Sequence, residues 1–135
     1  MIRELTVPQA HCEEMLRFLR DAYPLEACGI LAGLHGRVHR VYAVENLLRS
    51  PVAFEMEPQQ QLQAMLELEE AGLEMLAIYH SHPMGPQTPS PTDVAKAYYP
   101  DVAHVIVSFS DRRSPSIRAF TIDEGVFDEI VLKIV

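Results

Sequence analysis

The stretch LEMLAIYHSHPMGPQTPSPTD, residues 73 to 93, places an apolar run directly before two histidines and a proline-rich loop directly after them. Leu73 to Tyr79 has the pattern of a buried strand, which would deliver His80 and His82 at its carboxyl end. Side chains two positions apart on an extended strand point to the same side. We therefore predict that the two imidazoles face one point in space.

The loop after the histidines contains prolines at positions 83, 86, 89 and 91 and then reaches Asp93. Proline restricts the backbone, which lowers the entropy cost of bringing Asp93 back toward the imidazoles. Imidazole nitrogens and carboxylate oxygens bind Zn²⁺ well, and a catalytic zinc usually has three protein ligands and an open fourth position. The stiff loop is therefore predicted to preorganise Asp93 as a third zinc ligand beside His80 and His82.

A plainer interpretation exists for any pair of nearby histidines, which can be surface residues or simple hydrogen-bonding partners. Here the pattern is longer: H-S-H-P is followed by six residues, a serine, two residues and an aspartate. Five specified residue types at fixed spacing arise by chance at about 10⁻⁷ per starting position if each type has a frequency of roughly 5%. The length of the pattern favours the metal site.

The segments around this stretch alternate between helical and strand patterns. Pro8 and the apolar spacing that follows predict a helix over residues 8–22, and a second helix is expected over 59–71, with Leu62, Met65, Leu66 and Leu68 on one stripe. A short helix is expected between 91 and 98. Strands are expected over residues 27–32, 37–44, 54–56, 73–79, 103–109, 116–121 and 127–135, the first two joined by a turn at His35-Gly36. This order predicts one mixed α/β domain over residues 1–135.

Composition narrows the classes of partner. The net charge of −8 disfavours nucleic acid, because phosphate binding needs Lys and Arg gathered on one face. No apolar run is long enough to span a bilayer and the N-terminus lacks a secretory pattern, so we expect no membrane association and a cytoplasmic protein. Cys12 and Cys28 do not form a disulfide framework and are expected to be reduced, partly buried thiols. The oligomeric state stays open, homo-oligomers included.

With these residues in view, the sequence resembles the JAMM, or MPN-plus, zinc metallopeptidases. The resemblance rests on H-[ST]-H-P followed by S-x-x-D, and on the upstream element Pro24-Leu25-Glu26-Ala27-Cys28-Gly29, which looks like that of the compact bacterial and archaeal branch. It continues through Asn46, Ser50-Pro51, Phe54 and Pro58 and covers about residues 5–121. It implies a single JAMM/MPN domain with a cytidine-deaminase-like fold, a curved mixed β-sheet flanked by helices.

The resemblance also implies a site and a reaction. His80, His82 and Asp93 match the zinc ligands, Glu26 the general acid/base and Ser90 the donor to the transition state. The implied substrate is a ubiquitin-like or sulfur-carrier protein, cut at the amide or isopeptide bond after its C-terminal Gly-Gly. Such a tail could add to a strand edge, which we expect within residues 46–54. Without the resemblance, Glu26 would be a solvated acid at a helix end and Ser90 a helix N-cap.

Other functions fit the residues less well. An MPN-type binding or scaffold module without catalysis would not require the complete set of ligands, Glu26 and Ser90. A zinc deaminase would need H-x-E and a later P-C-x-x-C, and neither occurs. Cys28 lacks an evident base and is interpreted as a core thiol. The remaining histidines (His11, His35, His39 and His104) are interpreted as structural or surface residues, and the methionines at 15, 56, 65 and 75 as core filling.

Overall fold

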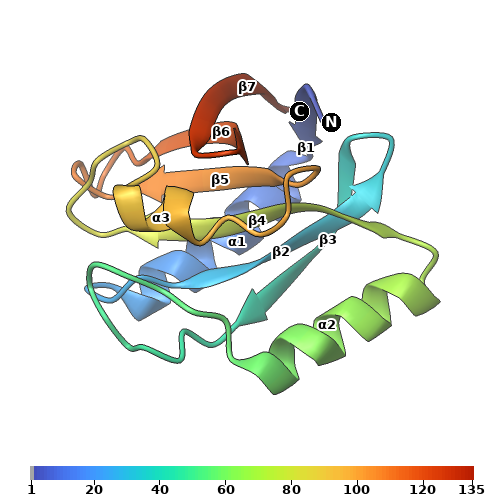
Figure 1. The fold of residues 1–135 in the computed structure, drawn as a ribbon, viewed down its shortest axis with the longest axis horizontal. Coiled ribbons are helices and arrows are strands. Elements are labelled where there is room, and N and C mark those ends of the chain that lie inside the picture. Colours follow the sequence, from blue (N-terminus) through green and yellow to red (C-terminus); the bar gives the residue numbers. More distant parts are fainter. Residues whose placement is uncertain (1) are drawn as a thin grey trace.

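A mixed sheet of seven strands organises residues 2–135, the part of the chain that this computed structural model describes. The strands are β1 (Glu4–Val7), β2 (Cys28–Leu34), β3 (Arg37–Val44), β4 (Glu74–His82), β5 (Ala103–Ser108), β6 (Ser116–Asp123) and β7 (Val126–Ile134). The helices are α1 (Gln9–Ala22), α2 (Pro58–Glu70) and α3 (Pro91–Ala95). The α/β class and the curved mixed sheet flanked by helices are confirmed (Figure 1).

The sheet closes on itself in the order β1-β3-β2-β4-β5-β6-β7. Its centre is β4, which runs antiparallel to β2 and parallel to β5. Closure depends on β1, which pairs in parallel with β7 along four residues and with β3 at a single position, Thr6 opposite Arg37. No strand was predicted over residues 4–7, so the closure of the sheet is a finding of the structure.

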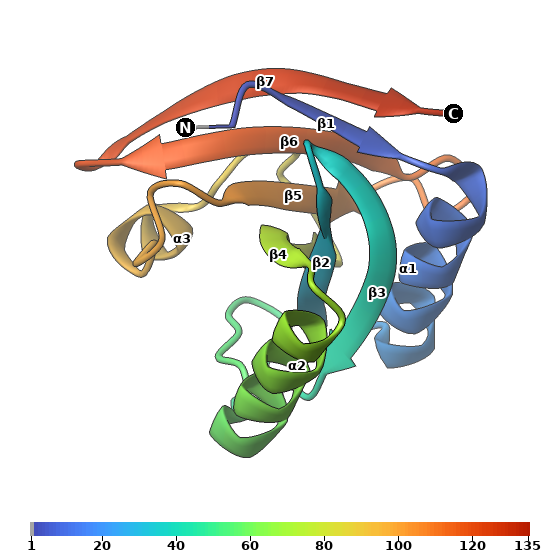
Figure 2. The same ribbon diagram turned by 90° about the vertical axis from the view of Figure 1, so that its right-hand side faces the viewer.

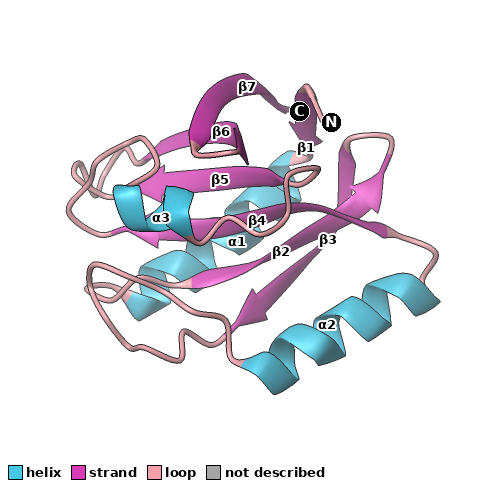
Figure 3. Ribbon diagram, viewed as in Figure 1, coloured by secondary structure: helices cyan, strands magenta, loops and turns pink. Residues whose placement is uncertain are grey.

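Helices α1 and α2 pack on opposite sides of the strands β2 and β3 (Figures 2 and 3). Each side has its own buried apolar cluster. The α1 side is built around Leu5, Met15, Leu19, Leu31 and Tyr79, and the α2 side around Ile30, Met56, Ala64, Leu68 and Ile78. Strands β4 and β5 are buried at nearly every position, so successive residues along them are apolar instead of alternating with polar ones. Within residues 2–135, no helix has the length and apolar character that crossing a membrane requires.

Most predicted elements are present, with two corrections. The turn at His35-Gly36 joins β2 and β3 as expected, with both residues at positive φ (53° and 75°), the geometry of a tight hairpin. Residues 54–56 form only an isolated bridge between Met56 and Asn46. On α2 the predicted apolar stripe is correct for Leu68, which is buried, and for Met65, which packs against the same cluster, but wrong for Leu62 and Leu66, which are 59% and 48% exposed. Ala64 completes the buried side of the helix.

One glycine lets the central strands approach closely enough to lock β4 in place. A Cβ on Gly29 of β2 would collide with the Tyr42 carbonyl and the Tyr79 hydroxyl. Because Gly29 has none, the Tyr79 hydroxyl of β4 passes across β2 and donates to the Tyr42 carbonyl of β3 at 2.9 Å. This bond ties three adjacent strands together one residue before His80.

Candidate metal centre

The two predicted histidines meet at the carboxyl end of β4. His80 pairs with Cys28 of β2 and with Ile106 of β5, so its backbone is held by a strand on each side. Both imidazoles point to the same face, and their Nε2 atoms are 3.0 Å apart. The side chains are 1% and 3% exposed. The prediction that alternate positions on the strand would direct both rings to one point is confirmed.

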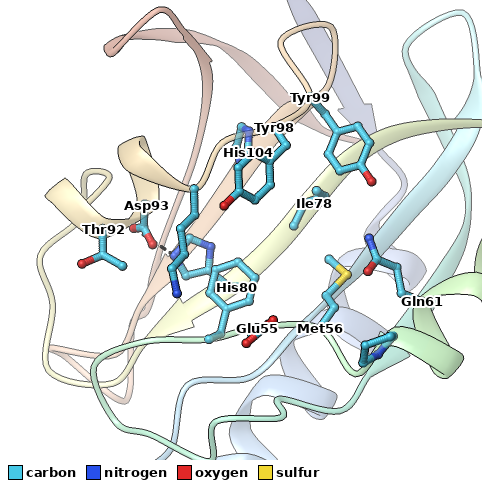
Figure 4. Close-up of a pocket in the computed structure, with 13 residues that line it drawn as sticks. Glu55, Met56, Gln61, Ile78, His80, Thr92, Asp93, Tyr98, Tyr99 and His104 are labelled. Carbon is cyan, nitrogen blue, oxygen red and sulfur yellow. Dashed lines mark hydrogen bonds and ion pairs between the residues drawn. The ribbon is translucent and has the colours of Figure 1, made fainter.

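Asp93 reaches the same point because of the way α3 begins. Ser90 is the N-cap of α3: its Oγ accepts the Asp93 N–H at 3.0 Å, and its own N–H donates to Asp93 Oδ2 at 2.9 Å. Pro91 occupies the first helical turn, where its missing N–H costs nothing. This reciprocal capping box holds Asp93 Oδ2 at 3.1 Å from His80 Nε2, the pair joined by a dashed line in Figure 4. The same oxygen lies 3.0 Å from His82 Nε2.

The proton positions on His82 make this triangle an electron-rich site. The Pro86 carbonyl can only accept, and it lies 2.8 Å from His82 Nδ1, so the neutral ring carries its proton on Nδ1. Its Nε2 lone pair then faces Asp93 Oδ2 and His80 Nε2. With a lone pair at His80 Nε2 as well, the three atoms would repel one another unless a cation or a proton lay between them. Ligands at tetrahedral zinc are about 3.3 Å apart for bonds of about 2.05 Å, so the three atoms fit Zn²⁺ closely.

One further contact holds the His80 ring. Phe54 stacks on His80 with the ring centroids 4.4 Å apart, and it covers the imidazole from the loop that follows β3. The second nitrogen of His80, Nδ1, is buried without a partner. Without an ion, burial and the Asp93 contacts act in opposite directions on the two imidazoles: burial lowers the pKa of His80, whereas hydrogen bonds to Asp93 and Pro86 outweigh burial and raise that of His82.

Glu26 lies on the other side of the imidazoles from the α3 cap. One of its carboxylate oxygens forms a group with a nitrogen of His80 and of His82 in which all three atoms lie within 4.8 Å. Glu26 is 4% exposed, and its Oε1 has no hydrogen-bond partner within residues 2–135. Burial raises the pKa of Glu26 to about 7, opposed by His82 and reinforced by Asp93. The alternative interpretation of Glu26 as a solvated acid at a helix end is therefore wrong.

Asn46 holds Glu26 in place, a role that the sequence analysis did not assign. Its Nδ2 donates to the carbonyls of Glu26 and Ala53 at 2.9 and 3.0 Å, and its Oδ1 accepts the N–H groups of Leu48 and Glu55, each at 3.1 Å. The buried amide is thereby saturated. The Glu26 N–H donates to the Ser50 carbonyl at 2.8 Å, so both backbone groups of Glu26 are fixed by the loop between β3 and α2.

Ser81, between the two histidines, joins Glu26 to β4. Its Oγ accepts the Ala27 N–H at 3.0 Å and its N–H donates to the Ala27 carbonyl at 3.0 Å. Ser81 therefore serves local hydrogen bonding between β4 and the segment before β2. These two bonds also set the spacing between Glu26 and the imidazoles, because they join Ala27, the residue after Glu26, to Ser81, the residue between the two histidines.

Two cavities adjoin the centre. One of about 260 Å³ borders His80 and Asp93 and is lined mainly by apolar and aromatic side chains, with His104 among them (Figure 4). The other, of about 410 Å³, borders Glu26 and Asn46. His104 is buried, burial lowers its pKa to about 4, and its Nε2 has no partner. His104 is thus a neutral imidazole at the wall of the site, although its spacing gave no signal of this.

The strand edge that was expected within residues 46–54 is not present in the structure. Residues 47–54 form a loop, with turns closed by bonds such as Arg49 N–H to the Asn46 carbonyl, so the strand edge expected there is absent. Cys28 is buried, and burial raises its pKa to about 12, which supports a core thiol rather than a nucleophile. Its Sγ donates to the Val44 carbonyl at 3.3 Å. The N-cap role of Ser90 is confirmed, and its Oγ–H is free to donate elsewhere because the cap uses Oγ as an acceptor.

Comparisons with known proteins agree with this geometry. The sequence profile of the prokaryotic homologs of the JAB domain matches residues 8–123. The chain is 35% identical over 123 residues to the CysO-cysteine peptidase of Mycobacterium tuberculosis, covering 90% of this chain and 84% of that one. It is 39% identical over 122 residues to the probable TtuB-protein conjugate cleaving protease of Thermus thermophilus, covering 90% and 78%. It is 39% identical over 90 residues to the desampylase of Pyrococcus furiosus, and this match covers 67% of the chain and 64% of the desampylase.

Solved structures give the same result for the fold. A Desulfitobacterium hafniense protein superposes with a TM-score of 0.85 at 37% identity, covering 97% of this chain and 94% of that one. A structure described as a metalloprotease-like zinc site in the proteasome and signalosome, named JAMM, superposes with a TM-score of 0.60 at 17% identity, covering 97% of both chains, and supports the fold alone. On the profile match and the extent of these relatives, the chain belongs to the prokaryotic homologs of the JAB domain.

Proposed function

We propose that this chain is a zinc-dependent metallopeptidase that hydrolyses the amide or isopeptide bond after the C-terminal Gly-Gly of a ubiquitin-like or sulfur-carrier protein. One observation carries the proposal: three potential ligand atoms, His80 Nε2, His82 Nε2 and Asp93 Oδ2, converge within 3.1 Å. Beside them lies the buried Glu26 carboxylate, one oxygen of which has no hydrogen-bond partner among the described residues. The substrate class rests on the names of the relatives, which are peptidases of CysO-cysteine and of TtuB conjugates and a desampylase.

His80 Nε2, His82 Nε2 and Asp93 Oδ2 would hold the zinc ion. Bound there, zinc would act as a Lewis acid that lowers the pKa of water toward about 7 and polarises the substrate carbonyl. The Nδ1–H bond from His82 to Pro86 fixes the tautomer that this ligation needs. Asp93 is already ionised without an ion, because the hydrogen bonds from the imidazoles and Ser90 outweigh burial and lower its pKa.

Glu26 would act as the proton carrier. A pKa of about 7 suits a general base at neutral pH, since the carboxylate can accept a proton and release it again. Glu26 would take a proton from the attacking water as the new C–O bond forms. It would return that proton to the leaving amine as the C–N bond breaks, which balances the reaction without a covalent acyl-enzyme. The Ser90 hydroxyl would donate to the carbonyl oxygen as negative charge develops on it.

The tail of the substrate would lie against the loop over residues 47–54 instead of extending a strand. This loop carries exposed apolar side chains, with Leu47 and Val52 among them, close to Glu26 and Phe54. Exposed apolar groups beside a site are typical of protein-binding surfaces. Two glycines would let the tail pass between this loop and the centre, because they have no side chain to collide with the stacked Phe54 and His80 rings.

The test uses purified protein and a panel of folded carriers, each ending in Gly-Gly fused to a short peptide or joined to a lysine side chain. We expect release of the carrier with its Gly-Gly terminus, loss of cleavage with a chelator and recovery on adding zinc. A carrier whose tail ends in Ala-Ala is the matched control. Cleavage that survives complete chelation would contradict the proposal. Stoichiometric zinc with no turnover on any carrier would instead indicate an MPN-type binding or scaffold module.

A further inference from the structure

Three arginines line one cavity near the metal centre, outside the residues assigned above. Arg20, Arg112 and Arg113, together with Tyr23 and Phe109, surround a space of about 430 Å³, which we call the arginine pocket. It lies where the carboxyl end of α1 meets the loop between β5 and β6. The same edge of the sheet holds the end of β4, at the left of Figure 1. Three of the eleven basic residues of a protein with a net charge of −8 are thus gathered at the edge that bears the centre.

The guanidinium groups in this pocket are not neutralised by the protein itself. Within residues 2–135, none of the three has a carboxylate oxygen within ion-pair distance. Arg112 lies over the Tyr23 ring at 4.1 Å from its centroid, and Tyr23 packs edge-on against Phe109. The nearby Asp111 carboxylate accepts the backbone N–H of Arg113 at 3.1 Å. Aromatic packing therefore places Arg112, and its charge stays available to a partner.

Two contacts connect the arginine pocket to the metal centre. The Phe109 N–H donates to the carbonyl of His82 at 3.1 Å. The Tyr23 hydroxyl lies 3.8 Å from the sulfur of Met84, which is 79% exposed and follows His82 by two residues. A protein whose tail occupies the centre would therefore have its folded body within reach of Met84 and the arginines.

We propose that the arginine pocket docks acidic side chains on the folded body of the carrier whose tail enters the metal centre, an inference that rests on the proposed function. Guanidinium groups match carboxylates through paired hydrogen bonds, and Arg is enriched in the energetic centres of protein interfaces. The rest of the surface, with its excess of negative charge, repels an acidic carrier. An unneutralised basic area beside the centre would then select both the partner and its orientation.

A folded protein fits the arrangement better than a small anion does. The pocket borders an exposed methionine and two aromatic rings, so charged and apolar groups are presented together, as in protein interfaces. Arg112 and Arg113 are also exposed on a surface loop rather than buried around a single point. Binding of a small anion remains a separate outcome that the experiment can detect.

The test compares Arg112→Glu/Arg113→Glu with Arg37→Glu/Arg40→Glu, a control with the same change in net charge on exposed residues of β3. Two substrates are used: an acidic folded Gly-Gly carrier fused to a peptide, and a short peptide with the same tail and no folded body. We expect KM for the folded carrier to rise about tenfold or more in the pocket variant alone, because basic steering and docking are lost. The KM for the short peptide should stay unchanged in the pocket variant. The salt dependence of kcat/KM for the folded carrier should be weaker in the pocket variant than in the wild type.

Further variants separate docking from folding and from a small-anion site. Arg112→Lys/Arg113→Lys keeps both charges and should retain the KM within a few-fold, and thermal unfolding identifies any variant that fails to fold. An unchanged KM, or an equal loss on the short peptide, would overturn the proposal. So would saturable binding of inorganic phosphate that the Glu variant loses while its KM for the carrier stays the same.

The two proposals can fail separately. If the wild-type protein cleaves neither substrate with zinc, binding of the intact folded carrier is measured by calorimetry. Weaker binding in the pocket variant, but not in the β3 control, would support docking although the peptidase proposal had failed. Absence of carrier binding by the wild-type protein would overturn the docking proposal itself.

Discussion

The two buried carboxylates on either side of the imidazoles differ in almost every contact. Asp93 Oδ2 accepts from the Ser90 N–H and faces both histidine Nε2 atoms, and its pKa is lowered. Glu26 has an oxygen without a partner, and burial raises its pKa to about 7. The contrast fits the two tasks proposed for the same chemical group, a permanently charged ligand at Asp93 and a reversible base at Glu26. The difference arises from the surroundings of each carboxylate: burial dominates at Glu26, whereas hydrogen bonds from His80, His82 and the Ser90 N–H outweigh burial at Asp93.

The largest expected effect comes from Glu26→Gln, which removes the base and keeps the shape. Cleavage of a Gly-Gly carrier fusion should fall by about 10²–10⁴-fold in kcat, the usual contribution of a general base. Glu26→Asp is the matched variant, which keeps a carboxyl group but withdraws it, and it should retain part of the rate. Full activity of the Gln variant would show that Glu26 is not the base, and the proposed contrast between Glu26 as base and Asp93 as ligand would fail.

Ser90 tests the Asp93 side of the comparison. Ser90→Ala removes the hydroxyl proposed to stabilise the developing oxyanion, which is worth about 2.7–4 kcal/mol for one such donor, or about 10²–10³ in kcat. It also removes the cap of α3, which should cost about 1 kcal/mol of unfolding free energy. Ser90→Thr keeps both the hydroxyl and the cap and is the control. A loss of stability with unchanged kcat would leave Ser90 with the cap alone.

The raised pKa of Glu26 predicts a pH dependence in the chelated, metal-free protein. The folded state binds this proton up to pH about 7, whereas the unfolded chain releases it near 4.5, so the stabilisation is complete below 4.5 and is lost as pH rises through 7. The full loss is at most about 3 kcal/mol at 1.36 kcal/mol per pKa unit. Denaturant unfolding of the chelated protein at pH 5 and pH 8 measures it. Glu26→Gln should remove this part of the pH dependence, and an identical profile in both proteins would contradict the assignment.

Asn46 is expected to have the smallest effect, because it acts on Glu26 only through the backbone. Asn46→Ala leaves two carbonyls and two N–H groups without their partner and should cost about 1–3 kcal/mol of unfolding free energy. The variant should lose only part of its turnover and keep its zinc, since no bond from Asn46 reaches His80, His82 or Asp93. If the variant lost zinc to the same extent as turnover, the placement of Glu26 would not be independent of the proposed zinc ligands His80, His82 and Asp93.

Local rules in the sequence predicted the Asp93 side of the site well. Alternation along a strand brings His80 and His82 together, and the spacing S-x-x-D produces the capping box that holds Asp93. These are relations within a few residues, which a pattern can express. The elements close to the predicted boundaries, such as β3 and α1, were predictable for the same reason.

The position and the pKa of Glu26 depend on contacts between segments that are far apart in the sequence. A local sequence pattern does not record such contacts. Asn46 organises Glu26 across twenty residues, and the raised pKa of Glu26 follows from burial that only the fold creates. The strand β1 is four residues long and gains its identity by pairing with β7, more than a hundred residues away. The stripe of α2 was misjudged because only a narrow side of this helix meets the sheet, which leaves Leu62 exposed.

The most direct test of the division between ligand and base is the zinc content and affinity of Glu26→Gln and Asp93→Asn, measured side by side by chelator competition. Glu26→Gln should keep one zinc per chain with affinity within a few-fold of the wild type. Asp93→Asn should lose more than about 100-fold in affinity, because even groups one shell beyond a ligand contribute 10–100-fold. Equal zinc affinity in the two variants, or a greater loss in Glu26→Gln, would contradict the account.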